Sequence, residues 1–270
     1  MLQVNNGRPA PVRVLQITDP HLMADPDGAL LGVKTRDSLD AVIAHAQADP
    51  RAPDFILATG DLAQDASETA YQAFAARLGG FSCPSAWVAG NHDDSALLQS
   101  VAGQHNADHR QILLGGWQIV MLDSSVHKKV HGYLAGHELA FLDQCLAEHP
   151  DTPAMVSLHH HPVTVGSGWM EDIGLHNRDA FWQMIDRHAQ VRVVLWGHIH
   201  QELDCYRGDV RLLATPSTCI QFTSGSREFA VEEKAPGYRW LDLHPDGRLE
   251  TGVRRALDFT FDLDVNSTGY

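Results

Sequence analysis

The sequence VRVLQITDPHL, residues 12–22, places a carboxylate and an imidazole directly after a predicted strand. Residues 12–17 are almost continuously apolar, which is typical of a strand that is covered on both faces. Asp19 and His21 follow, two positions apart. A single pair of this kind is more often a surface pair or a helix cap than a ligand pair. Its meaning therefore depends on the ends of the other strands.

Four further predicted strands also end in Asp, Asn or His. The strands and the residues at their ends are 54–59 with Gly60 and Asp61, 85–90 with Asn91, His92 and Asp93, 153–159 with His159 to His161, and 191–196 with Gly197, His198 and His200. Because the C-terminal strand ends of an open α/β sheet line its functional crevice, we expect these side chains to converge. His198 and His200 are the strongest pair, since alternate residues of an extended segment face the same way.

Strands alternate with helices along most of the chain, which predicts an α/β fold. Helices are expected at 35–47, at 67–78 with Ser67 as the N-cap, at 137–149 and at 178–190. A hairpin is expected at 111–123, turning at Gly115 and Gly116. After about residue 202 short β-like segments replace the helices. We expect a single domain over residues 1–270, in which 202–270 complete a second sheet and provide a C-terminal flap or tail.

The residue types at the strand ends indicate metal binding. Asp, Asn and His without Cys suit divalent ions that accept mixed oxygen and nitrogen ligands, such as Mn, Fe or Zn. The seven candidates are too many for one ion. They fit two ions that share a carboxylate, an arrangement that activates water for attack at phosphorus. Gly60, Gly90 and Gly197 precede key residues and would allow the backbone to pass close to the ions.

Composition limits the function classes. The formal charge is −14 and no block of Lys or Arg stands out, so we expect no nucleic-acid partner. An anionic substrate would then need a local positive charge, which bound metal supplies. We find no membrane-length apolar run, no signal peptide and no C-x-x-C spacing among Cys83, Cys145, Cys205 and Cys219. We therefore expect a cytoplasmic protein with no membrane partner.

The chain resembles the calcineurin-like metallophosphoesterase superfamily in five ordered motifs: Asp19-x-His21, Gly60-Asp61, Gly90-Asn91-His92-Asp93, His159-His160 and Gly197-His198-x-His200. The resemblance implies a two-sheet β-sandwich flanked by helices, with a two-metal site at the strand ends. It implies that the ligands of one ion are Asp19, His21, Asp61 and His200. For the second ion it implies Asp61, Asn91, a histidine of the 159–161 run and His198, with Asp61 as the bridge.

The run His159-His160-His161 departs from the His-His-Pro-Pro pattern that is common in this family. A gap-free match that ends on Pro162 and Val163 makes His159 the ligand. Counting back two residues from Pro162 selects His160 instead. We favour His159, because it lies at the end of the apolar run, as the other candidates do.

Longer segments resemble the bacterial class III cyclic-nucleotide phosphodiesterases, and among them the cyclic-AMP enzymes. These segments are LLGVKTRDSL, ATGDLAQD, GHIHQELD, LLATPSTCIQF and APGYRWLDL. The resemblance implies hydrolysis of 3′,5′-cyclic AMP to 5′-AMP with two divalent ions, Fe(II) and/or Mn(II) or alternatively Zn, and it leaves a homodimer open. Neither the ligands nor the periodicity specifies adenine. The alternatives are another small phosphodiester or phosphomonoester substrate, and a non-catalytic scaffold with the same fold.

Asn91 and His92 are the residues that we expect to touch the substrate. His92 lies beside the candidate ligand Asn91 without being a ligand itself, so it is our candidate for the general acid that protonates the leaving 3′ oxygen. Asp93 either orients the His92 imidazole or caps the following helix. Trp169 and Phe222 either stack on the base or are buried in the core or in a lid.

Overall fold

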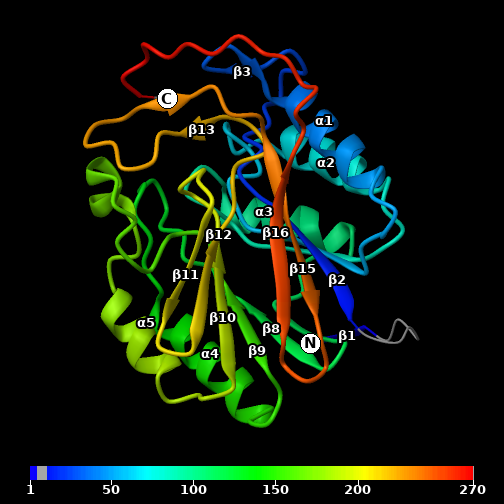
Figure 1. Ribbon diagram of the computed structural model, residues 1–270, viewed down its shortest axis with the longest axis vertical. Helices are drawn as coiled ribbons and strands as arrows, with labels where there is room; N and C mark the ends of the chain where they lie inside the picture. The colour runs from blue at the N-terminus through cyan, green and yellow to red at the C-terminus, as the bar shows by residue number, and fades with distance from the viewer. Residues whose placement is uncertain (5–10, 270) are drawn as a thin grey trace.

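The computed structural model describes residues 1–4 and 11–269, and its main feature is a pair of large β-sheets (Figure 1). The seven-stranded sheet contains, in spatial order, β1 (Leu2–Val4), β7 (Gln111–Leu114), β8 (Trp117–Met121), β9 (Ala154–Ser157), β10 (Val191–Trp196), β12 (Val210–Ala214) and β11 (Leu203–Arg207). The five-stranded sheet contains β16 (Leu249–Arg255), β15 (Gly237–Leu243), β2 (Val12–Ile17), β5 (Phe55–Ala58) and β6 (Ser85–Trp87). Two short ribbons pair β3 (Ala29–Leu30) with β4 (Val33–Lys34), and β13 (Gln221–Phe222) with β14 (Val231–Glu232).

Helices cover the outer face of each sheet. The five-stranded sheet packs against α1 (Thr35–Gln47), α2 (Glu68–Leu78) and α3 (Ser95–Gln104). The seven-stranded sheet packs against α4 (Gly136–Glu148) and α5 (Arg178–Ile185), and a 3₁₀ helix, η1 (Gly168–Ile173), precedes α5. A third apolar cluster fills the space between the sheets. The predicted α/β fold, a two-sheet sandwich flanked by helices, is confirmed.

Strand β2 explains why four of residues 12–17 are apolar, with Arg13 and Gln16 as the exceptions. Val12 and Val14 enter the core between the sheets. Leu15 and Ile17 point to the opposite face and join the core beneath the helices. Successive side chains of a strand alternate between its two faces, so a strand that is covered on both faces needs apolar residues at nearly every position. All six residues of β2 are buried.

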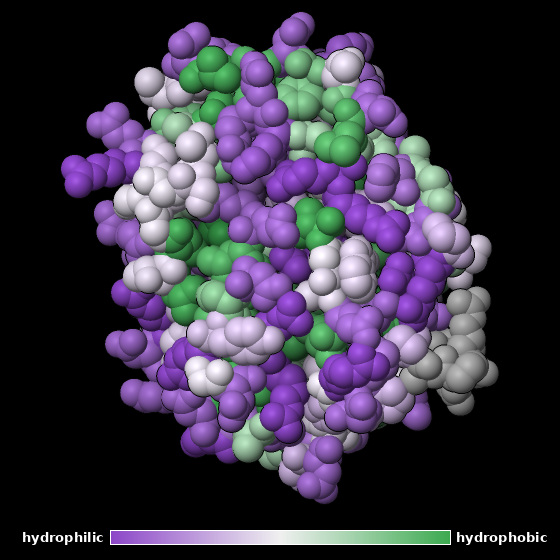
Figure 2. Space-filling model, in the orientation of Figure 1, coloured by the Kyte–Doolittle hydropathy of each residue, from purple (hydrophilic) through white to green (hydrophobic). Residues whose placement is uncertain are grey.

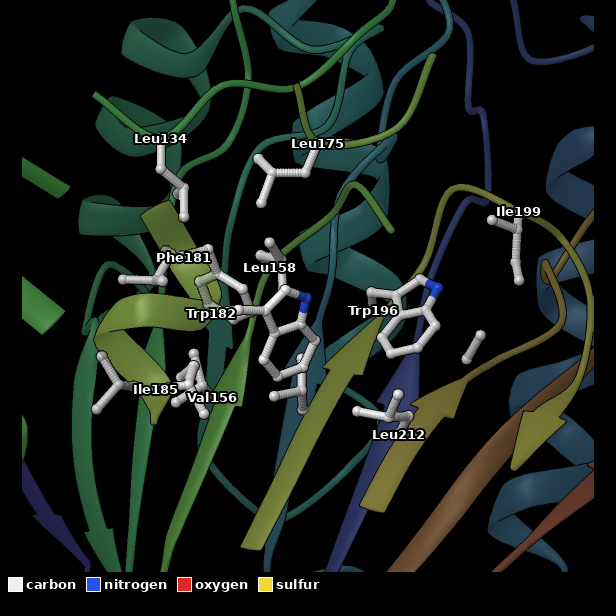
Figure 3. Packing of buried hydrophobic residues seen from close by; sticks show 14 of the residues in the cluster. Leu134, Val156, Leu158, Leu175, Phe181, Trp182, Ile185, Trp196, Ile199 and Leu212 are labelled. Atoms are coloured by element: carbon white, nitrogen blue, oxygen red, sulfur yellow. The ribbon is translucent and has the colours of Figure 1, made fainter. Parts of the chain in front are cut away.

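Helix α5 holds the segment that follows the histidine run. Figure 3 shows Phe181, Trp182 and Ile185 on the face of α5 that packs into the apolar cluster beside the seven-stranded sheet. The indole Nε1 of Trp182 also donates a hydrogen bond of 2.8 Å to the carbonyl of Pro162. Apolar burial and one buried hydrogen bond therefore fix the chain just beyond His161.

Several elements have the bounds that the sequence predicts. Strand β2 and helix α1 agree with the predicted ranges. Ser67 caps α2, because its hydroxyl accepts a hydrogen bond of 3.2 Å from the N–H of Ala70. The β7–β8 hairpin turns at Gly115 and Gly116, where positive φ values of 60° and 86° favour glycine.

Other predicted bounds were wrong. Strand β6 ends at Trp87 and not at residue 90, because the chain turns toward Asp61, whose carboxylate a Cβ on Gly90 would overlap. Helix α5 ends at Ile185 and not at residue 190, since the N–H of His188 bonds to the carbonyl three residues earlier, as in a turn. Helix α3 begins at Ser95, two residues after Asp93, which the sequence offers as the cap of a following helix.

Residues 202–270 supply strands to both sheets and not to the second sheet alone. Strands β11 and β12 extend the seven-stranded sheet, and β15 and β16 extend the five-stranded sheet. After β16 the chain crosses the top of the molecule beside β3 (Figure 1), where the N–H of Asp264 bonds to the carbonyl of Leu31 at 2.9 Å. That residues 1–270 form a single domain stays a prediction.

A buried ion pair joins β2 to β15 at one end of the five-stranded sheet. Arg13 Nε and Nη2 each donate a 2.7 Å hydrogen bond to the carboxylate of Asp242, whose side chain is 5% exposed. Arg51 donates to the same carboxylate at 2.6 Å. The hydrogen bond that Arg13 donates to Asp242 raises the pKa of Arg13, so this guanidinium stays charged inside the protein.

Replacing Asp242 should be costly, because the buried Arg13 guanidinium loses its two-point contact and keeps only Asp49, at 3.3 Å, as a counterion. We expect Asp242→Ala to lower the free energy of unfolding by about 3–5 kcal/mol in urea titrations. The matched control is Asp186→Ala, which breaks a similar two-point contact with Arg207 where the Asp186 side chain is 52% exposed. That change should cost less than about 1 kcal/mol. Equal losses would contradict the role assigned to burial.

Candidate metal centre

The ends of five strands meet at one edge of the sandwich and bring the proposed ligands together. These residues are Asp19 and His21 after β2, Asp61 after β5, Asn91 after β6, His159 after β9, and His198 and His200 after β10. One ligand atom from each of Asp19, His21 and His200 lies within 4.8 Å of the others, and the same holds for Asp19, Asp61 and His159. Asn91 Oδ1 lies 3.2 Å from His159 Nε2.

Gln16 joins the two sheets beside this cluster. Its Nε2 donates to Thr59 Oγ1 at 2.8 Å and to the carbonyl of Trp196 at 3.0 Å. Gln16 belongs to β2 in the five-stranded sheet, whereas Trp196 ends β10 in the seven-stranded sheet. These buried hydrogen bonds therefore fix the two sets of strand ends relative to each other.

Five of the proposed ligands have a left-handed backbone conformation. The φ angles of Asp19, His21, Asp61, His198 and His200 lie between 48° and 65°. Such conformations cost about 1–3 kcal/mol at non-glycine residues, and they persist where the surrounding structure holds them. Here the N–H groups of Asp19 and His21 bond to the carbonyls of Gly60 and Asp61, both at 3.0 Å. The strand ends are thus held in tight turns that direct side chains to one point.

The rings of His21 and His200 meet through nitrogens that carry lone pairs. His200 Nδ1 lies 3.0 Å from the carbonyl of Ile220, and His21 Nδ1 lies 2.7 Å from Gln64 Oε1. Both oxygens only accept hydrogen bonds, so in the neutral rings the hydrogen is on Nδ1. The two Nε2 atoms then face each other at 3.1 Å. Facing lone pairs repel, and a cation that both can bind removes the repulsion.

His159 is oriented in the same way. Its Nδ1 donates to the carbonyl of Thr59 at 2.8 Å, and its Nε2 lies 3.2 Å from Asp61 Oδ2. Burial alone would lower the pKa of His159, but the charges of Asp61 and Asp19 raise it to about 9. The negative charge that attracts a proton to this ring also attracts a metal ion, and both bind the same lone pair.

Two further atoms make no hydrogen bond within the described part of the chain, although His159 Nε2 lies 3.2 Å from one of them, Asp61 Oδ2. Asp61 Oδ2 and His198 Nδ1 are buried and make no hydrogen bond. His198 Nε2 lies 3.1 Å from the carbonyl of Ile173, so the lone pair of its neutral ring is on Nδ1. Burial alone would raise the pKa of Asp61, but His159 and His92 hold it well below its usual value. Unpaired buried acceptors are costly, so these residues fit divalent cations.

His160 differs from His159 because both of its ring nitrogens contact protein oxygens. Nδ1 lies 2.8 Å from Ser124 Oγ and Nε2 lies 3.1 Å from the carbonyl of Val130. These contacts support His159 over His160 as the proposed ligand. His161 is also buried, and its ring lies nearly parallel to that of His198, with 5.6 Å between the ring centroids.

Two glycines are needed for close packing of the ligand side chains. A Cβ on Gly197 would overlap Thr18 Oγ1 and Asp19 Oδ2, and one on Gly60 would overlap the His159 ring. Gly60 also has a positive φ of 100°. The sequence predicts that these glycines allow close approach to ions, and the structure shows close approach to the ligand side chains themselves.

The helix-cap role considered for Asp93 was wrong, because Asp94 caps α3 by accepting a hydrogen bond from the N–H of Leu97. The Asp93 carboxylate accepts instead from the N–H groups of Leu62, Ala63 and Gly90, at 3.2, 3.0 and 2.8 Å. It therefore ties the turn after Asp61 to the turn that carries Asn91. No local sequence signal marks this role, since its partners are backbone groups.

Phe222 is packed against the candidate ligands. It is buried, and its ring stacks on His200 with 4.1 Å between centroids and 4° between planes. The half-buried Trp169 meets Phe222 edge to face at 5.0 Å. These contacts favour the packing role that the sequence leaves open for Phe222 over stacking on a substrate base.

Comparison with known proteins identifies the family of this chain. Residues 12–202 match the model of the calcineurin-like phosphoesterase family. The chain belongs to this family. Family membership implies divalent metal ions, and the structure brings Asp and His residues into clusters that could hold them. No helix in the described residues is long and apolar enough to cross a membrane.

Relatives within the calcineurin-like phosphoesterase family match nearly the whole chain. A Pseudomonas aeruginosa protein and an Escherichia coli K12 protein, both named 3′,5′-cyclic adenosine monophosphate phosphodiesterase CpdA, are each 42% identical over 97% of this chain and 96% of their own. A Nostoc protein named 3′,5′-cyclic-nucleotide phosphodiesterase is 36% identical over 91% of this chain and 93% of its own.

Solved structures share the fold at low identity. A dimetal phosphatase from Danio rerio superposes with a TM-score of 0.67 and 16% identity, covering 92% of this chain and 97% of its own. The purple acid phosphatase PPD1 from yellow lupin gives a TM-score of 0.65 and 14% identity, covering 96% of this chain and 54% of its own.

Metal content should distinguish His159 from His160. We expect His159→Ala to retain about one metal ion per chain and His160→Ala to retain about two, when protein loaded with Mn(II) is desalted and analysed by mass spectrometry. The reason is that His160 nitrogens already contact Ser124 and Val130. Each variant removes one buried imidazole, so each is a control for the packing that the other loses. The opposite pattern would select His160.

Proposed function

We propose that this protein hydrolyses 3′,5′-cyclic AMP to 5′-AMP. The observation that carries the proposal is the 42% identity, over nearly the full length, to two relatives named 3′,5′-cyclic adenosine monophosphate phosphodiesterase. The candidate metal centre supports it, because every residue expected for two-metal hydrolysis is present at the converging strand ends.

The proposed ligands divide into two sets that share Asp61. Asp19, His21, Asp61 and His200 would hold one ion, and Asp61, Asn91, His159 and His198 the other, with Fe(II) and/or Mn(II) proposed and Zn as the alternative. When bound, the ions supply a water of lowered pKa and positive charge beside the phosphodiester. The protein orients each neutral imidazole for this purpose through its other ring nitrogen, as the contacts to Ile220, Thr59 and Ile173 illustrate.

His92 is placed to protonate the leaving group. Attack of hydroxide on phosphorus breaks the bond to the 3′ oxygen, and that oxygen needs a proton to leave as the ribose hydroxyl. The backbone N–H of His92 bonds to Asp61 Oδ1 at 2.8 Å, and its ring lies 5.1 Å from the ring of His21. Unlike the buried proposed ligands, Asn91 and His92 are partly exposed, so both can reach a bound phosphodiester.

We propose a cytoplasmic protein that acts on a small cyclic nucleotide, with no nucleic-acid or membrane partner. Its four cysteines, Cys83, Cys145, Cys205 and Cys219, are free, which is typical of a reducing compartment. The face in Figure 2 is largely hydrophilic, with apolar residues in scattered groups. A homodimer stays a prediction.

A panel of substrates tests the proposed function. Metal-free protein should be inactive, and Mn(II) or Fe(II) should restore hydrolysis of cyclic AMP in preference to cyclic GMP, bis-p-nitrophenyl phosphate and p-nitrophenyl phosphate. Cleavage of the generic diester without turnover of either cyclic nucleotide would retain the metal site and reject the substrate. Loss of all metal-dependent activity would favour a non-catalytic scaffold.

Replacing His92 should separate catalysis from metal binding. We expect His92→Ala to lower kcat by about 10²–10⁴-fold, the usual contribution of a general acid, while metal content stays at the wild-type level. The control is His137→Ala, since the His137 side chain is 79% exposed and lies at the start of α4. Unchanged turnover in His92→Ala would remove this residue from the mechanism.

A further inference from the structure

We propose that Lys128 and Lys129 capture the anionic phosphate of the substrate at the rim of the metal centre. They lie in residues 124–133, SSVHKKVHGY, hereafter the lysine loop. This inference rests on the proposed function, because it assigns these lysines a role in capturing the phosphoester on which the proposed site acts.

Two of the four lysines of this protein have no ion pair among the described residues. The chain has a formal charge of −14 and only four lysines. Lys34 is paired with Asp27 at 2.8 Å, and Lys234 with Glu232 at 2.9 Å. Lys128 and Lys129 are exposed and have no ion pair among the described residues. Half of the lysines thus lie side by side, with their charges uncompensated.

The lysine loop is attached directly to the metal centre through His160. The Ser124 hydroxyl and the Val130 carbonyl contact the two ring nitrogens of His160, at 2.8 and 3.1 Å. A Cβ on Gly132 would overlap the same ring. The centroid of the His160 ring lies 4.8 Å from that of His198 and 5.0 Å from that of His159. A single imidazole therefore separates the loop backbone from two proposed ligands.

The loop borders the partly exposed side of the centre. Asp123, the residue before it, accepts a hydrogen bond from the hydroxyl of Ser95, the first residue of α3. Asn91 and His92, which are proposed to meet the substrate, lie just before that helix and are partly exposed. The lysines and His92 thus belong to adjoining segments of one rim.

The base of the loop is fixed while its tip carries the charge. Lys129 N–H bonds to the carbonyl of Val126 at 2.9 Å, and Lys128 has a positive φ of 59°, so the tip is a tight turn. Behind the tip, the rings of His131 and His176 stack with 3.7 Å between centroids, and the N–H of His176 bonds to the carbonyl of Gly132. A turn fixed in this way presents its charges without a cost for ordering the backbone on binding.

This arrangement predicts electrostatic capture that depends on salt. Two exposed positive charges at the rim attract an anion at low ionic strength, and salt removes the attraction. We expect Lys128→Gln/Lys129→Gln to lower kcat/KM for cyclic AMP by about threefold to tenfold at low ionic strength. Because neither lysine belongs to the catalytic machinery, kcat should stay within about twofold of wild type.

The matched control removes the same charge elsewhere. Arg187→Gln/Arg207→Gln neutralises two ion-paired arginines, the exposed Arg187 just after α5 and the half-buried Arg207 at the end of β11. Both lie near the start of β10, at the opposite edge of the sheet from the strand ends. We would measure kcat/KM from about 20 mM to about 500 mM salt, which shortens the Debye length severalfold. The lysine variant should converge with wild type as salt rises, and the arginine variant should follow wild type throughout.

Charge on the ligand gives a second readout. 5′-AMP carries more negative charge than cyclic AMP, so its inhibition constant should rise by a larger factor in the lysine variant than KM does. A lysine variant that follows the control at every salt concentration would overturn the inference. Should wild type not hydrolyse cyclic AMP, the proposed function fails, and calorimetry with inorganic phosphate on metal-loaded protein decides the role of the lysines. Weaker phosphate binding in the lysine variant alone supports capture, and equal binding rejects it.

Discussion

The structure is organised around a buried cluster of hydrogen-bond acceptors that has too few donors. The carboxylates of Asp19 and Asp61 and the lone pairs of three imidazoles face one another inside the protein, and each of these rings is held by an oxygen at its other nitrogen. Such a cluster is unfavourable without cations, since buried charges and lone pairs repel. The chain forms this cluster with five residues in the left-handed backbone conformation. It also needs a glycine at position 197, where a Cβ would overlap Thr18 and Asp19.

The two-sheet fold supplies this cluster from both sides. Parallel strands β2 and β5 place Asp19 and Asp61 at one edge of the five-stranded sheet, and parallel β9 and β10 place His159, His198 and His200 opposite them. Neither sheet carries a complete set of ligands, so the packing between the sheets sets the ligand geometry. The hydrogen bonds of Gln16 to Thr59 and Trp196 hold the two sheets together directly beside this cluster.

The sequence predicts the parts of the structure that depend on neighbours along the chain. Apolar runs fix β2, the N-cap of Ser67 fixes the start of α2, and the order of Asp, Asn and His after the strands predicts the candidate site. It does not predict contacts with distant backbone, such as those of the Asp93 carboxylate, nor the stacking of Phe222 on His200. The choice between His159 and His160 also depends on Ser124 and Val130, which lie 30 to 36 residues away.

The central claim is that two divalent ions share Asp61 at the meeting point of the sheets. The most direct measurement is anomalous X-ray scattering from crystals of the Mn(II)-loaded protein. We predict two peaks on either side of the Asp61 carboxylate, one among Asp19, His21 and His200, and the other among Asn91, His159 and His198. A single peak, or peaks away from Asp61, would contradict this account.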